Sequence, residues 1–233
     1  MRPVVILKTG TTLARLLPRG DYEDWIAAGL GVPNVEVCRL SEGEALPEAA
    51  VPRAVIITGS AAMVTDRLEW SERAVPWLLE VLARETPLLG ICYGHQLLAH
   101  ALGGEVGPNP RGREIGTIEV DLTSAAASDP LLGGLGPRLV VSASHRQSVL
   151  RLPDAARHLG GNATDPNQAF TVGARAWGVQ FHPEWDHEVA RAYVEERAAV
   201  LREEGLDPDA LLAQVRPSSD GAAILRRFGE LAR

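Results

Sequence analysis

The chain has 233 residues, of which 45% are hydrophobic and 23% charged, the composition of an ordinary globular protein. Its formal net charge is −7 and no basic cluster is present, so we expect neither nucleic acid nor an anionic membrane as a partner. No apolar run reaches the roughly 18 residues of a membrane span, and the N-terminus lacks the pattern of a signal peptide. Two cysteines make no disulfide framework, and we expect a reduced, cytoplasmic setting.

Short apolar runs alternate with helical or turn-rich segments in the first hundred residues. The strand candidates are Val4–Lys8, Val35–Arg39, Ala54–Thr58 and Leu88–Cys92. Between the last two, apolar residues recur at helical spacing from Ala74 to Leu82, and a second apolar helical face follows the last strand. This alternation predicts an α/β fold of three layers, α/β/α, around a mostly parallel sheet.

The pattern changes after Gly104, where strand candidates follow one another closely and predict an antiparallel extension of the sheet. They are Ile115–Leu122, Leu139–Ala143, Val149–Leu152, Gln168–Gly173 and Ala176–Phe181. Helices are expected at about Glu188–Leu201, Pro208–Gln214 and Ala222–Leu231. Because no long linker interrupts the chain, we expect a single domain over residues 1–233, with a core of about 4–194 and a helical tail of about 195–233.

A cysteine between two glycines is the most informative motif of the chain. The segment Gly90-Ile91-Cys92-Tyr93-Gly94 follows an apolar strand and precedes a helix. Nucleophiles are presented on tight strand-to-helix turns of this kind, where flanking glycines avoid backbone clashes. The positive end of the helix dipole favours a thiolate there. Cys92 is therefore the candidate nucleophile, against the alternative of a buried structural cysteine.

A second motif supplies a candidate base and its orienting acid. His182 follows the strand candidate Ala176–Phe181 and begins the sequence His182-Pro183-Glu184. Glu184 lies two residues after His182, and at that spacing off a strand end both side chains can point the same way, so the carboxylate can hold the imidazole. A thiol nucleophile requires such a base and carboxylate. The spacing predicts a Cys-His-Glu triad.

Together these two motifs resemble the class I (triad-type) glutamine amidotransferase family, whose order of elements the chain also follows from about Val4 to about Val194. The resemblance implies a flavodoxin-like fold, and we expect no cofactor and no metal. It implies that Cys92 attacks the side-chain amide carbon of glutamine and forms a γ-glutamyl thioester, which releases ammonia, while His182 moves protons and Glu184 orients it. Within the family the chain is most similar to stand-alone proteins that resemble the glutaminase domain of GMP synthase.

The same resemblance extends to groups around the triad. The backbone N–H groups of Gly59 and Tyr93 would form the oxyanion hole. Gln96, Ser144 and His145 match positions that contact the glutamine, although His145 reads equally well as a satisfied hydrogen-bond donor. Many relatives have a proline after the oxyanion strand, whereas this chain has Gly59-Ser60-Ala61, which predicts a looser turn.

Three functions stay open at this point. The first is a glutamine amidotransferase or glutaminase, which supplies ammonia to a separate synthase subunit because the chain leaves no room for a fused one. The second is a γ-glutamyl hydrolase that acts on γ-glutamyl amines or peptides through the same triad. The third is a non-catalytic binding or regulatory module, which the intact triad disfavours. His182, Glu184 and His187 also have the residue types of a metal site, but no further ligand cluster completes one.

Overall fold

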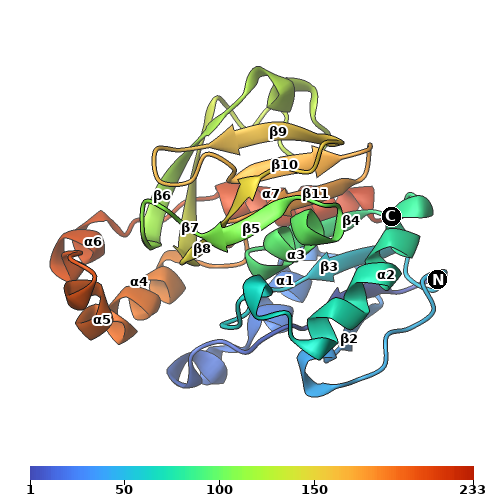
Figure 1. Ribbon diagram of the computed structural model, residues 1–233, viewed down its shortest axis with the longest axis horizontal. Coiled ribbons are helices and arrows are strands. Elements are labelled where there is room, and N and C mark those ends of the chain that lie inside the picture. The colour runs from blue at the N-terminus through green and yellow to red at the C-terminus, as the bar shows by residue number, and fades with distance from the viewer.

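Nine strands form a mixed sheet through the centre of the computed structural model, which describes residues 1–233 (Figure 1). The strands are β1 (Val4–Leu7), β2 (Val35–Cys38), β3 (Ala54–Ile57), β4 (Leu88–Ile91), β6 (Glu114–Leu122), β7 (Arg138–His145), β9 (Ala156–Gly161), β10 (Ala169–Val172) and β11 (Ala176–Val179). Their order across the sheet is β2-β1-β3-β4-β11-β10-β9-β6-β7.

The five strands from β2 to β11 in this order are mutually parallel, and the remaining four continue the sheet in antiparallel fashion. β11 is thus the junction, since it pairs in parallel with β4 and antiparallel with β10. Both halves match the fold expected from the sequence. Because the strands are parallel, the carboxyl ends of β3, β4 and β11 lie next to one another at a single edge, where open α/β sheets bind their ligands.

Helices cover both faces of the parallel half. The alternation of side chains along β1 sends Val4 and Ile6 to one face and Val5 and Leu7 to the other, and all four are buried. On the first face lie α1 (Tyr22–Leu30) and α7 (Asp220–Leu231), and on the second lie α2 (Glu69–Ala83) and α3 (Tyr93–Ala101). This arrangement is the three-layer sandwich that the sequence predicts.

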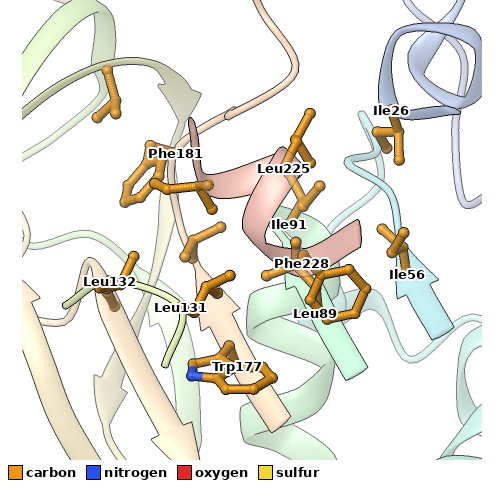
Figure 2. Close-up of a cluster of buried hydrophobic side chains, with 14 of the residues drawn as sticks. Ile26, Ile56, Leu89, Ile91, Leu131, Leu132, Trp177, Phe181, Leu225 and Phe228 are labelled. Atoms are coloured by element: carbon orange, nitrogen blue, oxygen red, sulfur yellow. The ribbon is translucent and has the colours of Figure 1, made fainter. Parts of the chain in front are cut away.

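The C-terminal helix α7 is part of the core on its face of the sheet. Leu225 and Phe228 pack among strand residues such as Leu89 and Ile91, as Figure 2 shows. Phe228 is fully buried and meets Trp177 edge to face, with ring centroids 6.2 Å apart. Full burial of one such side chain contributes about 1.5–3 kcal/mol of stability. The helical tail therefore helps to hold the parallel strands in place.

Two details of the predicted secondary structure are wrong. The segment Val149–Leu152 does not extend the central sheet, because β8 (Gln147–Arg151) pairs with β5 (Glu105–Pro108) in a separate two-stranded sheet. The chain turns at Arg146 directly after β7, which sends β8 away from the central sheet.

The single helix expected over Glu188–Leu201 is interrupted. It consists of α4 (His187–Glu196) and α5 (Ala198–Glu203), with Arg197 between them, and α6 (Pro208–Gln214) follows at its predicted position. These three helices gather at one end of the molecule (Figure 1). No helix of the chain combines the length and apolar character needed to cross a membrane.

Candidate active site

Cys92 lies directly after β4 and has a strained backbone. Its φ of 51° and ψ of −98° are unusual for a residue with a side chain, and α3 begins at the next residue. Such strain costs on the order of 1–3 kcal/mol and persists only where the surrounding structure enforces it. The backbone N–H of Cys92 donates to Val179 O of β11 at 2.9 Å, and its carbonyl accepts from Gln96 N at 3.1 Å. The strand-to-helix elbow predicted from the sequence is therefore present.

The flanking glycines are required by the tight packing of this elbow. A Cβ on Gly90 would collide with the backbone of Gly94, and a Cβ on Gly94 would lie 2.5 Å from the carbonyl oxygen of Ile57. Helix α3 thus starts in direct contact with the end of β3. This close approach places Cys92 between the ends of β3 and β11.

His182 and Glu184 follow β11, the strand next to β4, and the His182 side chain lies beside Cys92. The Nδ1 of His182 lies 2.7 Å from the Oε1 of Glu184, and both side chains are buried. The backbone N–H of His182 donates to Ser142 O at 2.7 Å, which fixes the segment after β11 against β7. The structure therefore brings the three predicted triad residues together.

The charge of His182 is governed by its two neighbours. Burial works to lower the pKa of His182, but the charges of Glu184 and Cys92 and their hydrogen bonds outweigh it and raise that pKa to about 10. His182 is therefore an imidazolium at neutral pH. A positive charge is thus held beside the sulfur of Cys92.

Aromatic rings pack against the imidazole of His182. The rings of His182 and Trp185 stack with centroids 3.8 Å apart and an interplanar angle of 13°. Trp185 in turn stacks on Tyr193 of α4 at 4.1 Å. The Tyr193 hydroxyl lies 2.6 Å from that of Tyr22 and 3.1 Å from the Thr12 hydroxyl. Sequence reasoning missed this support, although Trp185 directly follows the His-Pro-Glu motif and offered a signal.

Gly59 lies against both catalytic candidates at the end of β3. A Cβ placed on it would be 2.8 Å from Cε1 of His182 and 3.7 Å from Cβ of Cys92, so only glycine fits. The Thr9 hydroxyl donates to Thr58 O at 2.9 Å, which orients the peptide that carries the Gly59 N–H despite the absence of a proline. Tyr93, the other predicted oxyanion residue, is the first residue of α3, so its N–H has no acceptor within the helix.

A pocket of about 190 Å³ opens beside Cys92, and Gln96, Ser144 and His145 all line it, as the sequence predicts for residues near the substrate. Gln96 uses its side-chain N–H groups within the protein, donating to Gln147 O at 2.8 Å and to Oε1 of Gln180 at 2.9 Å. Its position is therefore fixed before any ligand binds.

His145 has a hydrogen-bond partner at both ring nitrogens. Its Nδ1 lies 3.0 Å from Gln147 O and its Nε2 lies 2.9 Å from a carboxylate oxygen of Glu114. Both partners are hydrogen-bond acceptors, and each ring nitrogen lies within hydrogen-bond distance of one of them. Glu114 also accepts from Gln168 and from Asn162, which completes a buried polar network. The His145 ring is thus a satisfied donor, while the residue itself borders the pocket.

The remaining candidates lie apart from the triad. His187 pairs with Glu188 at 3.2 Å on a partly exposed helix start, and no group of three or more His, Cys, Asp or Glu side chains is arranged to hold a metal. Cys38 is a free, buried cysteine at the end of β2. Two arginines that sequence reasoning did not single out, Arg113 and Arg197, line the pocket.

A strained cysteine on a strand-to-helix elbow, with a histidine and a carboxylate after a neighbouring parallel strand, defines an α/β protein with a triad arrangement. The profile of the family described as "Glutamine amidotransferase class-I" matches residues 26–200. The chain belongs to this family.

Curated relatives are consistent with this family. The chain is 38% identical over 184 residues to a "GMP synthase [glutamine-hydrolyzing]" of Aeropyrum pernix, which covers 79% of this chain and 33% of that protein. It is 37% identical over 121 residues to a glutamine-hydrolysing GMP synthase subunit of Methanothermobacter thermautotrophicus, covering 52% of this chain and 61% of the relative. The chain thus spans about a third of the length of the first of these relatives.

Solved structures show the same fold. A glutamine amidotransferase from Thermotoga maritima superposes over 100% of this chain and 99% of its own, with a TM-score of 0.77 and 23% identity. A glutamine amidotransferase from Methylobacillus flagellatus covers 100% and 93% of the two chains, with a TM-score of 0.75 and 23% identity.

Proposed function

We propose that this protein is a glutamine amidotransferase or glutaminase that hydrolyses the side-chain amide of glutamine to ammonia and glutamate. The observation that carries the proposal is the position of His182, which is hydrogen-bonded to Glu184 and faces Cys92 on a strained elbow. The names of the GMP synthase relatives, which are described as glutamine-hydrolysing, support the choice of glutamine.

The first half of the reaction forms a thioester. The Cys92 thiolate attacks the side-chain carbonyl carbon, and the negative charge that develops on the oxygen is stabilised by the N–H groups of Gly59 and Tyr93. When the tetrahedral intermediate collapses, the carbon–nitrogen bond breaks and the His182 imidazolium gives its proton to the departing nitrogen. Ammonia leaves, and a γ-glutamyl thioester of Cys92 remains.

The second half restores the enzyme. Neutral His182 takes a proton from water as the water oxygen attacks the thioester carbonyl. Collapse of this second intermediate breaks the carbon–sulfur bond, so glutamate leaves and the thiolate–imidazolium pair forms again. Glu184 stabilises the imidazolium and keeps Nε2 directed at the sulfur. We propose further that the ammonia passes to a separate synthase subunit, because the Methanothermobacter relative is named as one subunit of a GMP synthase.

The direct test is release of ammonia and glutamate from glutamine by the purified chain. Cys92→Ala should abolish release, whereas Cys38→Ala, the matched control, should retain the wild-type rate because Cys38 lies on the far side of β1 from the site. A trapped thioester on Cys92, detected as a mass increase on the peptide that contains it, would support the intermediate. Turnover that survives Cys92→Ala contradicts the proposal.

A further inference from the structure

The pocket beside Cys92 is positively charged in an otherwise acidic protein. Three arginines line it, whereas no aspartate or glutamate does, although the whole chain carries a formal net charge of −7. A pocket whose charged lining is all of one sign selects ligands of the opposite sign. The part of the substrate that lies beyond the reacting amide is therefore expected to be anionic.

One of the three arginines already has a counter-charge in the protein. Arg113 makes a two-point contact with Glu204 at 2.7 and 3.0 Å, and only 8% of its side chain is exposed. This pair contributes little net charge to the pocket.

Arg197 also lines the pocket, and no carboxylate of the protein pairs with it. It forms no salt bridge, and its buried Nη1 has no hydrogen-bond partner in the protein. Arg146 also lines the pocket but is exposed to solvent. A buried guanidinium donor that bonds to nothing in the protein is costly, unless a ligand completes it.

The position of Arg197 is fixed by the same rings that support the catalytic base. Its guanidinium carbon lies 4.8 Å over the ring of Tyr193. Tyr193 stacks on Trp185, and Trp185 stacks on His182. These four side chains form a continuous stacked column, from His182 at one end to Arg197 at the other. The guanidinium is therefore ordered at the pocket before a ligand binds, so binding costs little side-chain conformational entropy.

We propose that Arg197 binds the α-carboxylate of the substrate and is the specificity-determining residue of this site. The inference rests on the proposed function and narrows its substrate class to γ-glutamyl amides that keep a free α-carboxylate. A pocket of about 190 Å³ suits a ligand the size of one amino acid. A guanidinium–carboxylate contact is a strong, charge-assisted hydrogen bond, and a neutral amide in place of the carboxylate forfeits it.

The first experiment needs no turnover. Alkylation of Cys92 by iodoacetate, which is anionic, is compared with alkylation by iodoacetamide, which is neutral and of similar size. Arg197→Gln should lower the ratio of the iodoacetate rate to the iodoacetamide rate by roughly fivefold to tenfold, because the iodoacetate rate falls. Arg202→Gln on α5 is the matched control, because its side chain is exposed and does not line the pocket. An unchanged iodoacetamide rate in Arg197→Gln shows that its site is intact.

The second experiment measures specificity. Hydrolysis of L-glutamine is compared with that of the same molecule whose α-carboxylate is converted to an amide. Wild-type protein should prefer L-glutamine by about tenfold or more in kcat/KM, and Arg197→Gln should remove most of this preference by raising KM for L-glutamine. Equal preference in wild type and Arg197→Gln overturns the inference.

The two experiments separate the two proposals. If the iodoacetate preference depends on Arg197 but glutamine is not hydrolysed, the anion site stands and the proposed function fails. If glutamine is hydrolysed but neither ratio responds to Arg197→Gln, the proposed function stands and the role of Arg197 is wrong.

Discussion

The imidazole of His182 lies flat on the indole of Trp185, with ring centroids 3.8 Å apart. A cation over the face of an indole is stabilised by about 2 kcal/mol when it is shielded from water. His182 is buried and Trp185 is only 7% exposed, so this contact is shielded. The stack therefore stabilises the charged form of His182 together with Glu184.

Replacing Trp185 should thus change the acid–base behaviour of the site. In Trp185→Leu the imidazolium loses its nearest aromatic ring, and the pKa of His182 should fall by about one unit from its raised value. NMR titration of the His182 ring is the measurement. Trp185→Phe keeps an aromatic face, so its His182 pKa should stay close to that of the wild type. Equal His182 pKa values in the wild type and in Trp185→Leu would show that the ring only fills space.

Gly59→Ala should impair the chemistry more than the fold. The added methyl group would lie 2.8 Å from Cε1 of His182, so either the imidazole or the oxyanion loop must shift. Loss of one oxyanion donor costs about 10²- to 10³-fold in kcat, which sets the expected scale. Gly43→Ala serves as the control, because its Cβ meets nothing within 4 Å but its φ of +89° is strained. The control should lose about 1 kcal/mol of stability and no activity.

The two thiols should differ sharply in reactivity. Because the pKa of His182 is raised to about 10, a positive charge stays beside the Cys92 sulfur over the neutral range. Alkylation of Cys92 by iodoacetamide should therefore be fast at neutral pH. At Cys38, burial and the charge of Glu44 raise the pKa of the thiol, so its alkylation should be slow throughout. Peptide mass analysis after timed labelling distinguishes the two sites. Preferential labelling of Cys38 would contradict this assignment.

Acid should destabilise the protein through His95. Complete burial lowers the pKa of this side chain to about 4, and the charges of Asp165 and His145 act on it in opposite directions. The unfolded chain binds a proton at this residue below about pH 6.5, whereas the folded chain does not until about pH 4. The free energy of unfolding should therefore not depend on His95 above about pH 6.5. As the pH falls from 6.5 toward 4, it should decrease by about 3 kcal/mol because of this residue.

The measurement for His95 is the free energy of unfolding by urea at several pH values. His95→Leu, which cannot be protonated, should show a shallower decline between pH 6.5 and pH 4 than the wild type. His158→Leu is a suitable control, since His158 is partly exposed and lies on β9. Parallel curves for wild type and His95→Leu would contradict the assignment.

The triad region was predictable because its parts are encoded locally. A nucleophile elbow needs glycines at fixed positions around the cysteine, and the strands before Cys92 and His182 are short, fully apolar runs. The two motifs are brought together by the parallel pairing of β4 with β11. That pairing was not predictable, because the segment of β11 is expected from the sequence in the antiparallel extension.

Other features depend on distant contacts that no local pattern encodes. The break between α4 and α5 at Arg197 was not predicted, because the helical periodicity of the sequence continues through it. The strand β9 was not predicted either, because it ends in Gly160-Gly161 and lacks the usual strand composition. The pairing of Glu114 with His145 follows from the register between β6 and β7, and the pairing of Arg113 with Glu204 joins segments 91 residues apart. Such pairs become visible only once the chain is folded.

The four residues of the stacked column lie close together in the sequence, within one short segment. Reading from His182 to Arg197, the order is His-Pro-Glu-Trp, seven residues, Tyr, three residues and Arg. Relatives that keep this whole string should share the carboxylate preference, whereas relatives that keep only His-Pro-Glu should share the hydrolytic chemistry with other substrates. The string thus offers a way to sort members of a large family by what they bind, before any of their structures is known.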